Sequence, residues 1–379
     1  MEPIYFDHAA TTRVLPEAAQ AALRAMTEDY GNPSSLYALG TRAAKALADH
    51  REAVAQALGC QAGEVIFTSG GTEGDNWAIS LAAHLGRHRG KHIITTAVEH
   101  SAVLEPCRQL EQEGYEVTYL KPDRTGHISA GQVAEALRED TVLVSVMLVN
   151  NETGCLFPVA DIARLLKERG SRALLHCDAV QGFLKVPCNP AGWGVDLMSL
   201  SAHKIGGPKG IGALYVRPDL RNLRPLLAGG GQEEGLRSGT EATAQIAGFA
   251  KAVALRQEGL EEKLAHMARI KAYCRERLLS IPGVVPVGGG EAPHILAVSL
   301  VGYPSANVIN DLGSQGICLS AGSACHRGKA SRGYAALGLD KRTAAGVLRL
   351  SFGPETTEGD IDALYEALLR HKNTRFSML

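Results

Sequence analysis

The chain has almost no net charge and no long apolar run. Its formal net charge of −1 argues against a nucleic-acid surface or a polybasic contact with a membrane. No apolar stretch approaches the roughly 20 residues that a helix needs to span a bilayer. The segment M-E-P-I-Y-F-D lacks the basic and hydrophobic parts of a secretion signal. We therefore expect a cytoplasmic protein with neither a membrane nor a nucleic-acid partner.

Closely spaced cysteines are also absent. No two of the eight cysteines lie within four residues of each other, which excludes a C-x-x-C redox or zinc pair. We therefore expect no metal site. Most of the cysteines are expected to be small buried side chains, and only Cys325 needs a separate explanation.

The chain is long enough for one large domain and a smaller one, since it has 379 residues of which 45% are hydrophobic. Apolar strands alternate with helical segments through its first part. Regular alternation of this kind predicts an α/β fold, with a mainly parallel sheet covered by helices on both faces. The predicted strands are 64–69, 92–98, 117–120, 142–149, 173–178 and 197–201, and the predicted helices are 70–83, 104–113, 132–138 and 159–168.

A long helical stretch, 243–280, is the expected boundary to the second domain, because its charged middle suits a solvated connector. Strands at 295–301 and 347–351 and helices at 305–314 and 361–370 follow it. This mixture predicts a small α/β C-terminal domain. We expect a large domain at 1–250, whose N-terminal segment docks near the small domain, and a small domain at 251–379.

One lysine stands at the end of an apolar strand. The segment S-L-S-A-H-K-I-G-G-P-K-G places Lys204 between that strand and a Gly-Gly-Pro turn, where it faces a cleft. Desolvation lowers the pKa of a lysine and makes its amine available to bond a carbonyl cofactor. A lone lysine in a turn is more often a surface residue, so its neighbours decide the interpretation.

The upstream segment A-L-L-H-C-D-A-V-Q-G ends another apolar strand with Asp178, followed three residues later by Gln181. Pyridoxal phosphate requires a carboxylate against its pyridine nitrogen, and Asp178 fits that role. Gln181 is placed to bond the ring hydroxyl. Ser201 and His203 are two apart on one strand and so share a face, from which both can reach the phosphate.

These two segments, S-A-H-K and H-C-D-A-V-Q, resemble the class V aminotransferase family, and within it the NifS/IscS-type cysteine desulfurases. The similarity extends from about Ile4 to about Leu368 and includes several motifs in the same order. It implies a homodimer that binds pyridoxal 5′-phosphate. It also implies a large cofactor-binding domain with a mainly parallel, seven-stranded type of sheet, plus a smaller C-terminal α/β domain.

The resemblance also implies where the cofactor is held. Gly71 and Thr72 open a helix, where free N–H groups and the positive end of the dipole favour an anion; the motif is weak alone but matches the phosphate-binding turn of the family. His100 would stack on the pyridine ring and carry a proton. Asn151 would face cofactor and substrate. Thr240, in G-G-G-Q-E-E-G-L-R-S-G-T, would contact the cofactor phosphate of the partner subunit.

Two further residues concern the substrate. Cys325 lies in L-S-A-G-S-A-C-H-R-G-K, a run without periodicity that predicts a loop, and the basic residues that follow favour the thiolate. A buried cysteine is the alternative, but the segment matches the nucleophile motif of the desulfurases. Its loop looks about two residues shorter than in long-loop members. Arg349, in V-L-R-L-S-F-G, matches the arginine that clamps the substrate carboxylate. No role is assigned to Tyr37, which stands where the family usually has histidine.

The implied activity is that of a cysteine desulfurase. Lys204 removes a proton from bound L-cysteine, Cys325 attacks the substrate sulfur, and L-alanine and a persulfide on Cys325 result. The persulfide sulfur then passes to an acceptor protein, such as an iron-sulfur scaffold or a thiolation carrier. A selenocysteine lyase or another aminotransferase or lyase of the same fold is the alternative. A non-catalytic scaffold is disfavoured, because Lys204, Asp178 and Cys325 are all present.

Overall fold

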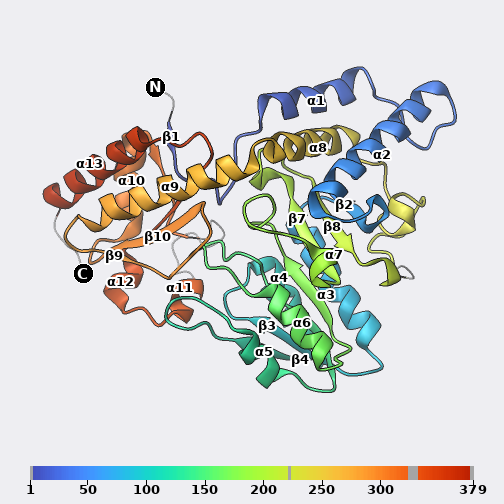
Figure 1. Cartoon of the computed structure of the whole chain (residues 1–379), viewed down its shortest axis with the longest axis horizontal. Helices are drawn as coiled ribbons and strands as arrows, with labels where there is room; N and C mark the ends of the chain where they lie inside the picture. The colour runs from blue at the N-terminus through green and yellow to red at the C-terminus, as the bar shows by residue number, and fades with distance from the viewer. Residues whose placement is uncertain (1–2, 221–222, 323–331, 376–379) are drawn as a thin grey trace.

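The computed structural model describes residues 3–220, 223–322 and 332–375. A seven-stranded sheet forms the centre of the larger part of the molecule (Figure 1). Along the sheet the strands are β2 (Val65–Thr68), β8 (Gly212–Val216), β7 (Leu197–Ser201), β6 (Leu174–Asp178), β5 (Thr141–Ser145), β3 (His92–Thr96) and β4 (Glu116–Leu120).

Strand β8 runs antiparallel to β2 and β7, and the other neighbouring strands pair in parallel. This confirms the predicted α/β fold with a mainly parallel sheet. The predicted strand 142–149 is shorter in the structure, where β5 ends at Ser145. The N–H groups of Val146 and Leu148 still donate to the carbonyls of His176 and Asp178 in β6, and the chain then turns at residues 151–153. Parallel strands place their carboxyl ends at one edge of the sheet, which is where such folds bind ligands.

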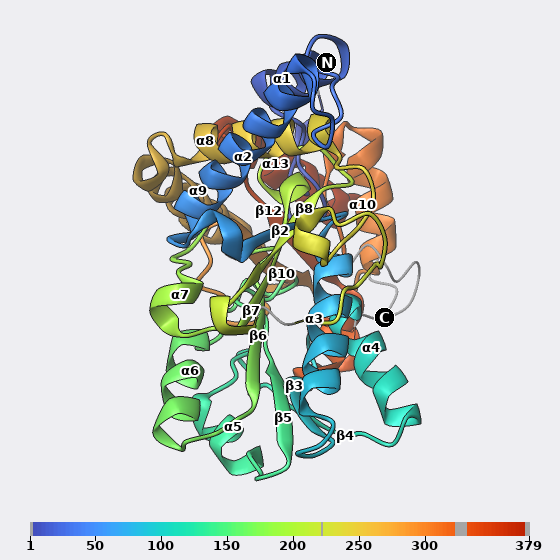
Figure 2. The same cartoon turned by 90° about the vertical axis from the view of Figure 1, so that its right-hand side faces the viewer.

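Helices cover both faces of this sheet, as Figure 2 shows. Because both faces are covered, β3, β5, β6, β7 and β8 are buried throughout, and apolar residues predominate in all of them except β3. One face carries α3 (Gly71–Gly86) and α4 (Ser101–Gln112). The other carries α5 (Ala130–Ala136), α6 (Val159–Glu168) and α7 (Pro190–Trp193). A further layer consists of α1 (Pro16–Thr27), α2 (Ala38–Leu58) and α8 (Thr243–Gln257).

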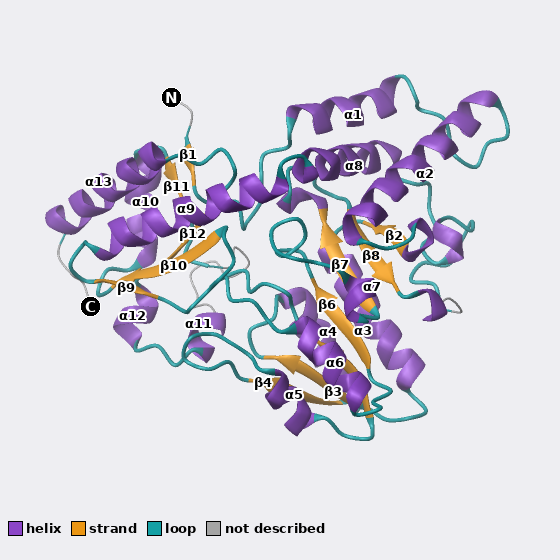
Figure 3. Cartoon of the chain, in the orientation of Figure 1, coloured by secondary structure: helices purple, strands orange, loops and turns teal. Residues whose placement is uncertain are grey.

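A smaller part is built around an antiparallel sheet in the order β12, β10, β9 (Figure 3). Its strands are β9 (Val284–Pro286), β10 (Ile295–Leu300) and β12 (Val347–Ser351), and its helices are α9 (Leu260–Leu279), α10 (Ser305–Ser314), α11 (Arg332–Ala336), α12 (Lys341–Ala345) and α13 (Glu358–Thr374). The N-terminal strand β1 (Ile4–Tyr5) pairs in parallel with β11 (Ile317–Cys318). Phe6 is therefore buried in the same apolar core as Ile270 and Phe352.

The predicted helical stretch 243–280 is divided in the structure. Helix α8 ends at Gln257 and α9 begins at Leu260, because Gly259 adopts a left-handed conformation with φ of 60°. A glycine is the residue that most readily adopts this conformation at the end of a helix. Lys263 donates hydrogen bonds from Nζ to the carbonyls of Leu255 and Glu258, which satisfies the last turn of α8.

The larger part and the smaller part have separate apolar cores. Ile246, Phe249 and Val253 of α8 belong to the first core, whereas Ile270 and Cys274 of α9 belong to the second. We propose that these cores correspond to two domains with a boundary near α8. Within the described ranges, no helix combines the length and the apolar character needed to cross a membrane.

Candidate active site

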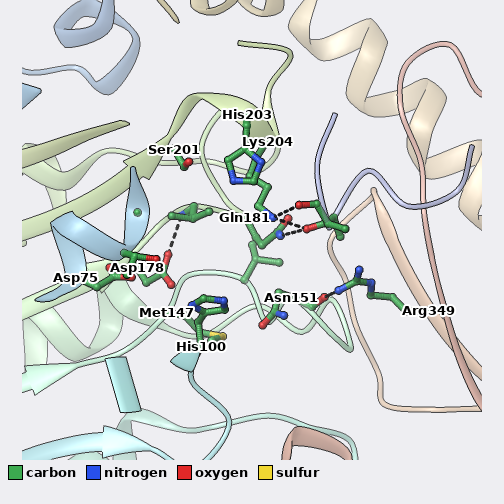
Figure 4. A pocket seen from close by; sticks show the side chains of 16 residues that line it. Asp75, His100, Met147, Asn151, Asp178, Gln181, Ser201, His203, Lys204 and Arg349 are labelled. Atoms are coloured by element: carbon green, nitrogen blue, oxygen red, sulfur yellow. Dashed lines mark hydrogen bonds between the residues drawn. The ribbon is translucent and has the colours of Figure 1, made fainter. Parts of the chain in front are cut away.

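Most of the predicted site residues line one cavity of about 240 Å³ at the carboxyl ends of the parallel strands (Figure 4). Thr240 does not line this cavity and is exposed, as is Tyr37. Cys325 lies outside the described residues. The predicted residues that line the cavity are Gly71, Thr72, His100, Asn151, Asp178, Gln181, Ser201, His203, Lys204 and Arg349.

Lys204 reaches the cavity from a single 3₁₀ turn, Ala202–Lys204, that follows β7 directly. Its Nζ donates hydrogen bonds to the carbonyl oxygens of Ala9 and Ala10, at 2.6 and 2.8 Å. The N-terminal segment therefore forms one wall of the site and holds the lysine amine at the cavity. This contact joins residues 194 or 195 positions apart, which no local pattern could predict.

Asp178 lies at the carboxyl end of β6 and accepts a hydrogen bond at Oδ1 from the Val180 N–H at 2.9 Å. Burial and the neighbouring Asp75 raise the pKa of Asp178 to about 7. The described residues therefore supply too little positive charge and too few hydrogen bonds to balance the negative charge of the Asp178 carboxylate. A protonated pyridine nitrogen would supply the missing positive charge, so the site fits this end of the cofactor.

Asp75 is a lining residue that the sequence interpretation missed. It lies in the first turns of α3, is 1% exposed, and has its pKa raised to about 7 by burial. Its Oδ1 lies 3.4 Å from Nε2 of His176, whose ring also contacts the hydroxyls of Ser145 and Ser199 at 2.8 and 3.0 Å. The sequence did contain a signal, because T-E-G-D-N places a carboxylate one turn after Gly71, which the resemblance assigns to the phosphate-binding turn.

Gln181 lines the cavity and has one polar atom bonded and one unbonded. Its Nε2 donates to the carbonyl of Ala9 at 2.8 Å, which fixes the orientation of the amide. Its Oε1 is buried and has no hydrogen-bond partner among the residues that the structure describes. A buried acceptor without a donor is costly, and the ring hydroxyl of the cofactor is such a donor.

The opposite end of the cavity is suited to a phosphate. Gly71 starts α3, and a Cβ there would lie 2.6 Å from Cγ2 of Val180, so only glycine lets the helix N-terminus approach this closely. Ser201 lies beside it at the end of β7. Burial, followed by the charges of Lys204 and Lys209, lowers the pKa of His203 to about 4. His203 Nδ1 contacts the Thr11 hydroxyl at 3.1 Å, which leaves Nε2 to donate to an anion.

His100 and Asn151 close the cavity from the β3 and β5 side. His100 is the N-cap of α4, and its Nδ1 accepts a hydrogen bond from the Ala102 N–H at 3.1 Å, which fixes the plane of the ring. Asn151 lies in a turn held by its neighbour Asn150, whose Oδ1 accepts from the N–H groups of Glu152 and Thr153. Two loops are thereby fixed at the mouth of the site.

Arg349 comes from β12 of the smaller part and is 1% exposed. Its Nη2 pairs with Asp7 at 2.7 Å, and its Nη1 donates to the carbonyl of Asn151 at 2.9 Å. Within the described part of the chain, its buried Nε has no hydrogen-bond partner. A guanidinium held in this way retains donors for a carboxylate at the cavity.

Comparison with known proteins agrees with this geometry. The family model described as aminotransferase class-V matches residues 4–364. The cysteine desulfurase IscS of Clostridium botulinum is 40% identical over 372 residues, covering 96% of this chain and 93% of the relative. A solved NifS-like protein is 35% identical with a TM-score of 0.93, covering 98% and 100% of the two chains. SspA in complex with cysteine is 34% identical with a TM-score of 0.81, covering 93% and 99%. The chain therefore belongs to the class-V aminotransferase family.

Proposed function

We propose that this chain is a cysteine desulfurase that converts L-cysteine to L-alanine and transfers the sulfur through Cys325. The observation that carries the proposal is one cavity in which Lys204, Asp178, His100 and Arg349 converge from four separate elements. Similarity to a relative named cysteine desulfurase IscS and to SspA in complex with cysteine supports the substrate. The family depends on pyridoxal phosphate, and the donors and acceptors of this cavity fit that cofactor.

The residues of the chain divide the chemistry among them. When bound, the cofactor supplies an electron sink that stabilises negative charge at the substrate α-carbon. Lys204 takes the α-proton, and the Cys325 thiolate attacks the substrate sulfur. The C–S bond of cysteine breaks and an S–S bond to Cys325 forms, while His100 or Lys204 returns a proton to the carbon that becomes the alanine methyl group. Cysteine and one enzyme thiol thus yield alanine and one enzyme persulfide.

The substrate carboxylate would bind Arg349 and Asn151. Arg349 is held from two sides, by Asp7 and by the Asn151 carbonyl, so its planar fork is oriented before the substrate arrives. Such preorganisation lowers the entropy that substrate binding must offset. The carboxylate is then fixed relative to the amine of Lys204, which also lines the cavity.

We also propose that the enzyme is a homodimer and that Thr240 completes the phosphate site of its partner. Thr240 is exposed, and its loop is held by the ion pairs Arg51–Glu233 at 2.6 Å and Arg237–Glu73 at 2.9 Å. Such a loop is rigid enough to present a side chain to a second copy. The test is the oligomeric mass, together with weakened cofactor binding in Thr240→Val.

The sulfur acceptor that we propose is a protein, with iron-sulfur cluster assembly as the pathway. The support is the name IscS carried by the relative from Clostridium botulinum. The described cysteines are all free, which suits a reducing compartment, and we propose the cytoplasm. Incubation of the enzyme with L-[35S]cysteine and a purified scaffold protein tests the transfer, and label that stays on the enzyme contradicts it.

The activity itself is tested by product analysis. Purified holoenzyme is incubated with L-cysteine and a reducing thiol, and alanine and sulfide are quantified. We expect equal amounts of both products, and nearly none from Cys325→Ala. Cys318→Ala is the matched control, because Cys318 lies in β11 of the same part of the chain and does not line the cavity.

Three outcomes would contradict the proposal. Pyruvate in place of alanine indicates a β-lyase, and 3-mercaptopyruvate indicates a transaminase. Full activity in Cys325→Ala removes the persulfide step. A loss of similar size in Cys318→Ala shows that the Cys325 effect is not specific to the nucleophile.

A further inference from the structure

A second lysine is buried behind Lys204, on the side away from the cofactor cavity. Lys185 follows β6 by seven residues and is only 8% exposed. Its Nζ has no hydrogen-bond partner among the residues described. A buried ammonium group without a partner is strongly unfavourable, so this amine must either lose its proton or receive an anion.

The backbone beside Lys185 is strained. Leu184 has a φ of 56°, which is in the left-handed region that side chains with a branched or bulky Cβ substituent avoid. Few non-glycine residues in the described ranges share this feature, and the others, Glu233 and Glu234, lie in the distant loop that carries Thr240. Strained residues of this kind persist where the surrounding structure over-determines them. Leu184 directly precedes Lys185, so the strained residue and the buried lysine are neighbours in the chain.

Lys185 lines a small cavity of about 30 Å³, which has room for a single water or a single small ion. Among the described residues, the titratable side chains that line it are lysine, arginine and histidine, and none is acidic. Lys204 lines this cavity as well as the cofactor cavity and so separates the two. The basic and histidine residues of the small cavity are His8, Lys185, Lys204, Arg256 and Lys263.

The other cations are partly satisfied by the backbone. Arg256 donates from Nε to the carbonyl of Ile205 at 2.9 Å, and Lys263 bonds two carbonyls at the end of α8. Carbonyl groups bear only partial charges and do not neutralise a cation. The acidic side chain at the edge of the cluster is Glu355, which lies 3.6 Å from His8 and is mostly exposed. The interior of the cluster thus keeps a positive potential.

A further histidine is affected by the charge of Lys185. His294 is fully buried, and neither ring nitrogen has a hydrogen-bond partner within the described chain. Burial first, and then the charge of Lys185, lower its pKa well below the ordinary value, so the ring is neutral and adds no further positive charge. Burial, followed by the charges of Lys204 and Arg256, also lowers the pKa of the Lys185 amine.

We propose that this cavity binds one monovalent anion of halide size, held between the Lys185 ammonium and the Arg256 guanidinium. Arg256 remains protonated whatever its surroundings, so the site keeps a positive charge at any physiological pH. The volume suits a single ion of chloride size, and gluconate is a much larger anion. An anion here also lies next to Lys204, and its charge favours the protonated form of that amine.

The inference does not depend on the proposed reaction, because its test measures binding rather than turnover. Crystals of the holoenzyme grown in gluconate are transferred to sodium bromide, and anomalous difference maps are calculated. We expect one bromide peak in contact with Lys185 Nζ. In parallel, the melting temperature is measured in bromide and in gluconate of equal ionic strength, since an ion that binds only the folded state raises it.

Lys185→Met keeps the length of the side chain and removes the amine, and Lys167→Met on the exposed surface of α6 is the control. We expect the halide-specific rise in melting temperature to disappear in Lys185→Met and to persist in Lys167→Met. The proposal is overturned if the wild-type cavity holds only a water in bromide. It is also overturned if the halide-specific rise is the same in Lys185→Met. The wild-type crystal tests the proposal by itself, so the test is valid even if Lys185→Met folds poorly.

Discussion

Replacing Asp75 by asparagine should stabilise the cofactor-free protein at alkaline pH. Asp75 is 1% exposed beneath the cavity, and its described partners are the neutral ring of His176 and the hydroxyl of Ser199. Burial lowers the pKa of His176 to about 4, so this histidine brings no positive charge. Asparagine has nearly the same shape as the protonated acid and cannot ionise.

The magnitude follows from the pKa of Asp75, which burial raises from 3.8 to about 7 in the folded protein. The folded state therefore binds more protons than the unfolded state between these two values, and stability falls as the pH rises through them. About three pKa units at roughly 1.4 kcal/mol each give a cost of about 4 kcal/mol, as an upper limit. Below about pH 4 both states are protonated and the cost vanishes.

The measurement is the urea denaturation of the cofactor-free protein at several pH values, for the wild type and Asp75→Asn. We expect equal stability near pH 4, and a variant that is more stable by up to about 4 kcal/mol near pH 8. Glu73→Gln is the matched control on the same helix. Burial acts to raise the pKa of Glu73, but the contacts with Arg237 and the hydrogen bonds from Ser69 together lower it, so removal of this carboxylate should destabilise the protein at pH 8.

Two results would refute this reasoning. If Asp75→Asn is no more stable than the wild type at high pH, another group in the folded protein compensates the charge of the buried carboxylate. If the stability gained by Asp75→Asn is the same at every pH, the gain comes from packing and not from ionisation.

Two further predictions concern ligand binding. Gly71→Ala places a Cβ 2.6 Å from Cγ2 of Val180, and an overpacking cost of about 1–3 kcal/mol corresponds to a loss of cofactor affinity of roughly 5-fold to 150-fold, measured by absorbance titration. Val180→Ala in the same chain should restore part of the affinity, and unchanged binding by Gly71→Ala alone would contradict the prediction. Arg349→Lys loses the bidentate fork and leaves Asp7 less well paired, so the KM for L-cysteine should rise roughly 30-fold, from about 2 kcal/mol of lost charged hydrogen bonds. A KM within a factor of two of the wild type, in steady-state assays, would show that Arg349 does not hold the substrate.

Local patterns predicted the large sheet because its strands are buried on both faces and therefore appear as apolar runs between helices. The same patterns placed Lys204 and Asp178 at strand ends, and both line the cavity. The patterns predicted one continuous helix where the conformation of a single residue divides it into two. The helical periodicity continues across residue 259, but the left-handed conformation of Gly259 separates α8 from α9.

The sequence by itself determined the order of strands and helices, the lysine and aspartate at strand ends, and the glycine at the start of α3. These depend on interactions between residues that are close along the chain. Only the tertiary structure decided that Asp7 holds Arg349, 342 positions away, and that the carbonyl of Ala9 orients Gln181. It also decided that Lys185 lies among basic groups behind Lys204. Such contacts depend on how all elements pack together, because the free energy of burying a charge is set by the neighbours that the whole fold supplies.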